Sequence, residues 1–158
     1  MNQLMNLLLV VLLCPSAVFG QLASLGAYNV IWSTPTVEVD GFFAGGMPLG
    51  NGDVQVLAWA NVTAGGVSIY VSKQDAIHSD TLLYKVALLT LSVSPNPYLS
   101  GPFFEQSLDL ASATVFVKAG GKNASNAAAT FAVWVDAHSN TGYAFAEIAE
   151  VEVFWFIG

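Results

Sequence analysis

The chain has 158 residues, of which 11 are acidic and only four are basic, all of them lysine, so the formal net charge is −7. An acidic chain without arginine cannot replace the counterions of a phosphate backbone, which excludes nucleic acid and an anionic membrane surface as partners. A single cysteine, Cys14, excludes disulfides within the chain. Stability must therefore come from a hydrophobic core, and 54% of the residues are hydrophobic.

The first twenty residues have the pattern of a signal peptide. Residues 7–14 form one apolar run, LLLVVLLC, and the small residues Val18 and Gly20 occupy the −3 and −1 positions of a cleavage site. The run is shorter than the roughly 20 apolar residues that span a bilayer. We therefore expect residues 1–20 to be removed from a secreted, extracellular protein. The remainder, residues 21–158, is expected to form one domain without a thiol and without a cofactor.

Several segments alternate apolar and polar residues with the period of a half-buried strand. In GVSIYVS, for example, Val67, Ile69 and Val71 share one face. The same pattern occurs in the segments that begin at Tyr28, Val54, Leu88, Ala113, Ala129 and Tyr143, with turn residues at 61–66, 95–97, 120–121 and 139–142. We expect seven or eight strands, no helix after the signal peptide, and an all-β antiparallel β-sandwich of the supersandwich type.

Two segments lack this alternation and are predicted to be loops. Residues 72–84 carry polar and charged side chains without a period of two, which predicts a long loop or a single helical turn. Residues 94–110 contain three prolines, which argue against a central strand. Loops on a rigid sandwich are where binding residues tend to lie.

The segment GGMPLGNGDV, residues 45–54, is rich in glycine and raises the question of a phosphate-binding loop. The glycine spacing of a P-loop is present, but Asn51 and Gly52 stand where that loop needs lysine and a hydroxyl. The residues from Val54 onward alternate as a strand, whereas a phosphate site needs a helix there. The segment is therefore predicted to contain a tight turn at Asn51-Gly52.

The quoted segments resemble the N-terminal β-sandwich domain of secreted microbial proteins similar to glycoside hydrolase family 95, the α-L-fucosidase-like enzymes. Six blocks occur in the same order: YNVIWSTPT, MPLGNGDV, YVSKQDA, KVALLTLSVSPNP, FEQSLDL and WVDAHSN. Gln55 and Ala87 depart from the pattern, since the relatives usually have glycine at both positions. In that architecture the sandwich precedes an (α/α)₆ barrel that carries the catalytic residues. The resemblance implies an accessory domain that contacts such a barrel, truncated before it.

No catalytic residue is predicted within this chain. Glycoside hydrolysis needs two carboxyl groups about 5–10 Å apart, and the sequence pairs none of its loop aspartates. Aspartate is also a favoured turn residue. His78 and His138 lack a partner at metal-ligand spacing, so no metal site is predicted. The loop aspartates considered as catalytic carboxylates are Asp53, Asp75, Asp80, Asp109 and Asp136.

Two polar groups are the best candidates for contact with a substrate or another domain. The first is Asn51 with Asp53, and the second is the run Lys73, Gln74 and Asp75 just after a predicted strand.

Two tryptophans and two sequons are further features that concern carbohydrate, either as a ligand or as an attached glycan. Trp59 and Trp134 are predicted to pack in the core, although an indole ring can also stack on a sugar. The sequons at Asn61 and Asn123 predict N-glycosylation of a secreted protein. Three functions are compatible with these features: an accessory domain of a glycosidase-like protein, a self-sufficient carbohydrate-binding module, and an inactive remnant.

Overall fold

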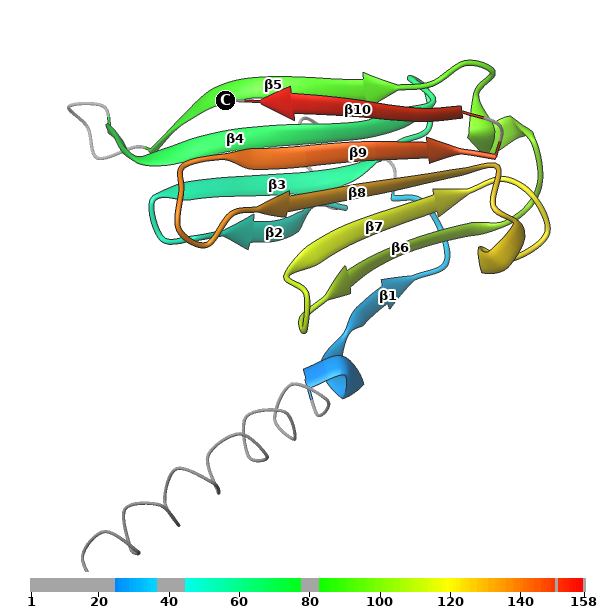
Figure 1. Ribbon diagram of the computed structural model, residues 1–158, viewed down its shortest axis with the longest axis horizontal. Coiled ribbons are helices and arrows are strands. Elements are labelled where there is room, and N and C mark those ends of the chain that lie inside the picture. The colour runs from blue at the N-terminus through cyan, green and yellow to red at the C-terminus, as the bar shows by residue number, and fades with distance from the viewer. Residues whose placement is uncertain (1–24, 37–44, 78–82, 150, 158) are drawn as a thin grey trace, which may run out of the picture.

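The computed structural model describes residues 25–36, 45–77, 83–149 and 151–157. The predicted signal peptide with Cys14, and also His78 and Asp80, lie outside these residues. Two antiparallel sheets pack face to face as one domain (Figure 1). This arrangement confirms the predicted all-β sandwich.

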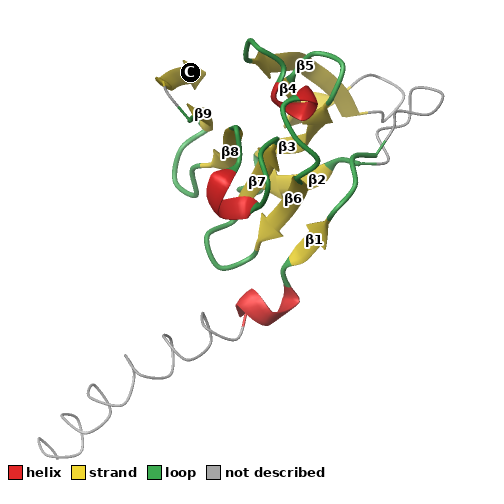
Figure 2. Cartoon of the chain, turned by 90° about the vertical axis from the view of Figure 1, so that its right-hand side faces the viewer, coloured by secondary structure: helices red, strands yellow, loops and turns green. Residues whose placement is uncertain are grey.

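The larger sheet has six strands in the order β1 (Val30–Trp32), β6 (Phe104–Asp109), β7 (Thr114–Ala119), β8 (Ala129–Val135), β9 (Gly142–Ile148) and β10 (Val151–Ile157). The smaller sheet has four, in the order β2 (Met47–Gly50), β3 (Val54–Asn61), β4 (Gly66–Ile77) and β5 (Leu83–Ser92). In the described residues, helical structure is limited to the 3₁₀ turns η1 (Gly26–Tyr28), η2 (Pro97–Leu99) and η3 (Ala124–Asn126) (Figure 2). None of these is long enough to cross a membrane.

The structure corrects three local predictions. Residues 72–77 are not a loop but continue β4, and register shifts in its pairing with β5 explain why the alternation is lost there. Phe104–Asp109 forms β6, the second strand of the larger sheet, because all three prolines of that segment precede it. The long run that starts at Tyr143 is not one strand but two, β9 and β10, which pair antiparallel.

The core lies between the sheets and includes alternate buried residues of β2, β3, β4, β6, β7, β8 and β9, such as Val56, Ala58 and Phe131. The prediction that Trp59 is buried is confirmed, although its side chain lies on the face of β3 opposite to Ala58. The prediction for Trp134 is wrong, because Trp134 alternates with core residues and lies on an outer face. Trp59 is buried against Tyr70, with ring centroids 5.4 Å apart. Trp134 is half-buried on the larger sheet.

A buried glutamine joins the two sheets inside this core. Gln106 of β6 is 1% exposed; its Nε2 donates to the carbonyl of Gly45 at 2.7 Å, and its Oε1 accepts from the N–H of Ala60 at 2.9 Å. In the β2–β3 ladder Met47 is opposite Ala58, so the same register extended by two residues sets Gly45 opposite Ala60. The Gln106 carboxamide thus takes the place of the next backbone rung.

The connection between the sheets after β5 is fixed by a half-buried polar group, the hydroxyl of Tyr98. The hydroxyl of Tyr98 in η2 donates to the carbonyl of Gly66 at 2.6 Å, and its ring packs beside Phe104. Burial raises the pKa of Tyr98, so the hydroxyl keeps its proton and remains a donor. The first residue of β4 and the first residue of β6 are therefore tied to the same turn.

Gln106→Glu tests the role of the carboxamide. A carboxylate can accept from Ala60 but cannot donate to Gly45, so we expect a loss of about 1–3 kcal/mol in unfolding free energy at neutral pH. Burial and the donor role raise the pKa of the new carboxyl in the folded state. The loss should therefore be small near the unfolded pKa of about 4.3 and grow as the pH rises through the folded pKa.

Urea unfolding at a series of pH values measures this dependence. Gln55→Glu, the same change at an exposed position of β3, is the control and should be insensitive to pH over the same range. A penalty for Gln106→Glu that stays constant with pH would contradict the proposed donor role.

Candidate functional site

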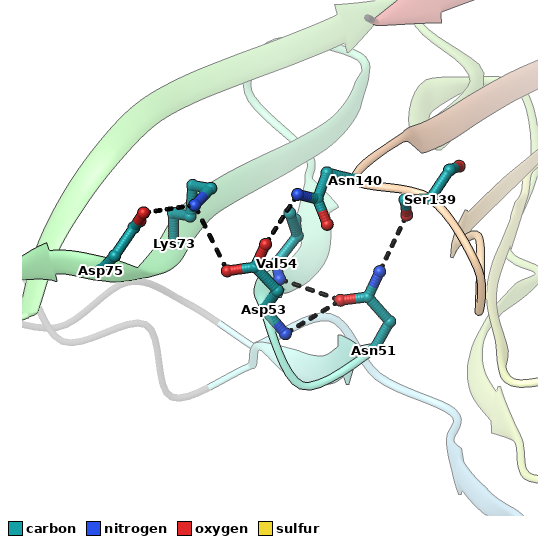
Figure 3. A network of polar contacts seen from close by, with 7 residues as sticks. All are labelled: Asn51, Asp53, Val54, Lys73, Asp75, Ser139 and Asn140. Atoms are coloured by element: carbon teal, nitrogen blue, oxygen red, sulfur yellow. Dashed lines mark hydrogen bonds and ion pairs between the residues drawn. The ribbon is translucent and has the colours of Figure 1, made fainter.

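The two predicted groups of contact residues meet at one end of the sandwich (Figure 3). Asn51 and Asp53 lie in the turn between β2 and β3, whereas Lys73, Gln74 and Asp75 lie on the adjacent part of β4. The backbone N–H of Gln74 donates to the carbonyl of Asp53 at 2.9 Å. The structure therefore brings together all five residues, which the sequence had placed in separate loops.

The turn itself forms for a local reason. The side-chain oxygen of Asn51 accepts from the N–H groups of Asp53 at 3.1 Å and Val54 at 2.9 Å, which makes an Asx turn. Gly52 has a φ of 97°, a left-handed conformation that favours glycine. The predicted tight turn at Asn51-Gly52 is confirmed.

The amide of Asn51 also reaches the opposite sheet. Its Nδ2 donates to the carbonyls of Asp136 at 2.9 Å and Ser139 at 2.8 Å, both in the loop between β8 and β9. From the same loop, Nδ2 of Asn140 donates to Oδ2 of Asp53 at 2.6 Å. We call Asn51, Asp53, Lys73, Asp75 and Asn140 the clasp, because together they join the smaller sheet to the larger one (Figure 3).

Lys73 supplies the positive charge of the clasp. Its Nζ lies 3.3 Å from Oδ1 of Asp53 and 2.6 Å from Oδ2 of Asp75. The hydrogen bond between Lys73 and Asp75 lowers the pKa of Asp75 and raises that of Lys73. These side chains are 38–72% exposed, so water screens the ion pairs and their net contribution to stability is small.

Two further aspartates that were considered as catalytic have structural partners. The N–H of His138 donates to Asp136 and lowers its pKa, which stabilises the β8–β9 loop. The hydroxyl of Ser112 and the N–H of Ala111 donate to Asp109 and lower its pKa in the turn after β6. A general acid needs a raised pKa, and the shift is downward at Asp75, Asp109 and Asp136.

An apolar cavity of about 260 Å³ lies next to the clasp, between the two sheets. Its walls come from β3, β4 and β5 on one side and from β8 and β9 on the other, and Asn140 is the one amide among the described residues that line it. Elsewhere in the described part of the chain, His, Cys, Asp and Glu side chains form no group of three that could hold a metal ion. The described surface thus offers an apolar recess with a polar rim.

The two sequons lie in different settings. Asn61 is the last residue of β3 and is half-buried, whereas Asn123 is exposed and caps η3 by accepting from the N–H groups of Ser125 and Asn126. Sequence reasoning missed Ser139 and Asn140 as partners of the clasp. The only available signal was the predicted turn at 139–142, which does not reveal contacts with residues more than 80 positions away.

Residues 31–150 match the family model described as Domain of unknown function (DUF5703), in its N-terminal part. This chain belongs to that family. The matched region begins in β1 and ends after β9, so it contains every residue of the clasp and both sequons. Comparison with curated proteins and with solved structures gave no match.

Asn51→Asp tests the link that the clasp makes between the sheets of this DUF5703 domain. The carboxylate keeps the acceptor of the Asx turn but cannot donate to the carbonyls of Asp136 and Ser139. We expect a loss of about 1–2 kcal/mol in unfolding free energy. Chemical denaturation of bacterially produced protein measures it.

Asn123→Asp is the matched control for this change, since that side chain also accepts two backbone N–H bonds at its turn. It should be close to neutral. Equal effects at the two positions would show that the donors of Asn51 do not join the sheets.

Proposed function

We propose that this domain is a non-catalytic accessory β-sandwich of a secreted glycoside hydrolase family 95-like protein, in which it supports and contacts a catalytic (α/α)₆ barrel. The observation that carries the proposal is the clasp. Three of the six blocks on which the family resemblance rests, MPLGNGDV, YVSKQDA and WVDAHSN, are the segments that meet there. The shared sequence thus encodes a fixed end of the sandwich.

The contacts within the clasp argue against catalysis by the same residues. Both carboxylate oxygens of Asp53 are engaged, one by Lys73 and the other by Asn140. Asp75 shares the same lysine and has a lowered pKa. A carboxylate that acts as nucleophile or acid must instead face a substrate and a water molecule. The apolar cavity beside the clasp is a suitable surface for packing against another domain.

The isolated chain should therefore not hydrolyse glycosides. The purified protein is assayed on a panel of aryl glycosides that includes aryl α-L-fucosides, with a family 95-like enzyme as the positive control. We expect release of the aryl group to equal the background rate. Turnover that disappears in Asp53→Asn or Asp75→Asn would show that the sandwich has its own catalytic carboxylate and would overturn the proposal.

A carbohydrate-binding module is the second candidate, and one observation favours it. The outer face of the larger sheet carries the half-buried aromatic side chains of Phe116, Trp134, Tyr143 and Phe145. Trp134 and Tyr143 are stacked, with ring centroids 5.1 Å apart and an interplanar angle of 11°. A net charge of −7 favours a neutral polysaccharide over an anionic one.

Affinity electrophoresis in gels containing neutral β-glucan or mannan tests this second function. If the domain binds carbohydrate, the polysaccharide slows the migration of the protein in the gel. Trp134→Ala should then weaken binding about three- to tenfold through the lost aromatic contact. Leu88→Ala, an exposed apolar position on the other sheet, is the control. Migration that no polysaccharide changes would contradict this second function.

A further inference from the structure

The first sequon has an aromatic neighbour that the second one lacks. Trp59 and Asn61 are two residues apart on β3, so their side chains lie on the same outer face of the smaller sheet. Thr63, which completes the sequon, follows in the turn to β4. The side chain two positions before Asn123 is absent, because residue 121 is glycine. The sequences around the two acceptor asparagines therefore differ in how they can contact a sugar.

A hollow of about 540 Å³ lies beside this sequon. Its described lining includes all of Trp59, Asn61 and Thr63, together with Pro35, Thr36, Ala60 and Val62. The volume is within the range of roughly 300–1,000 Å³ that is typical of sites for small ligands. Trp59 is only 7% exposed, and the hollow is the space that its remaining surface borders.

Asn61 is held in a defined orientation at the edge of the hollow. Its Oδ1 accepts from the N–H of Ala64 at 2.9 Å, and its Nδ2 donates to the hydroxyl of Ser68 at 2.9 Å. An amide nitrogen that carries a sugar keeps one N–H, so the bond to Ser68 is compatible with glycosylation. Asn96 donates to the carbonyl of Val62 at 2.9 Å and fixes the turn from the other side.

We propose that the hollow receives the first N-acetylglucosamine of an N-linked glycan on Asn61, which packs against Trp59 and stabilises the β3–β4 hairpin. The apolar C–H face of the sugar lies against the indole, whereas its hydroxyls remain toward water. In the attachment step a bond forms between Nδ2 of Asn61 and the anomeric carbon. The bond from that carbon to the pyrophosphate of a lipid-linked oligosaccharide breaks, and Nδ2 loses one proton. The proposal requires secretion but is independent of the proposed function.

The chain itself offers the comparison that tests this proposal. The wild type, Thr63→Ala and Ser125→Ala are produced in a eukaryotic secretory host, and intact mass reports which sequon is occupied. Thr63→Ala removes the Asn61 glycan but leaves the hydrogen bonds of Asn61 to Ala64 and Ser68. Ser125→Ala does the same for Asn123, whose side chain caps η3. Bacterial samples of all three proteins give the effect of each substitution without a glycan.

The melting temperature after trimming to a single N-acetylglucosamine is the decisive measurement. Trimmed and untrimmed wild type should melt at the same temperature, about 2–4 °C above Thr63→Ala. The difference in melting temperature between the bacterial wild type and bacterial Thr63→Ala, which carry no glycan, is subtracted first. Ser125→Ala should melt with the wild type. Absence of a glycan on Asn61, or a glycan there with no thermal effect, would overturn the proposal.

The role of Trp59 is tested separately. In Trp59→Leu the glycan should still be attached, but its effect on the melting temperature should disappear, and persistence of the full effect would overturn the packing of the sugar on Trp59. If Trp59→Leu does not fold, NMR of the trimmed wild type decides instead. Nuclear Overhauser contacts between the sugar and the indole of Trp59 support the proposal, and their absence contradicts it.

Discussion

The two sheets depend on the carboxamide of Gln106, because it is a buried polar group that only one alignment of the sheets can satisfy. A shift of β6 by one residue would turn Gln106 outward and leave the N–H of Ala60 and the carbonyl of Gly45 without this partner. A shift by two residues would bring Phe104 or Leu108 to the same place. Apolar packing is tolerant of small slips, whereas an unsatisfied buried amide is costly. Gln106 therefore specifies how the apolar faces meet.

The clasp also joins the two sheets, at the other end of β3. This strand begins beside Asn51 and Asp53, which reach the β8–β9 loop, and its penultimate residue, Ala60, is bonded to Gln106. Both ends of one strand are thus joined to the opposite sheet. The polar residues that resemble a ligand-binding loop in the sequence are used to hold the sandwich together. Among the described residues, the apolar cavity, the outer aromatic face and the hollow beside Asn61 are surface features in addition to the clasp.

Errors in the local predictions have physical causes that can be traced to particular residues. Pro102 precedes Phe104 by two positions, so proline excludes a strand only where it stands and not over the whole segment. Alternation fails after Val71 because the pairing of β4 with β5 is irregular there, although the backbone remains extended. Trp134 was wrongly predicted to lie in the core because period-two alternation shows only that two sets of residues face opposite ways. It does not show which set is covered by the other sheet.

The sequence by itself determined the all-β class, the tight turn at Asn51-Gly52, and the polar groups that became the clasp. These features follow from local chemistry: strand periodicity, the positive φ that glycine allows, and side chains that bond to their own turn. Only the tertiary structure decided that Asn51 and Asp53 meet Asn140, that Gln106 replaces a rung between Gly45 and Ala60, and that Trp59 shares a hollow with Asn61. Such contacts join residues that are distant in the chain or are fixed by which face is buried, and both are set by the packing of the whole chain.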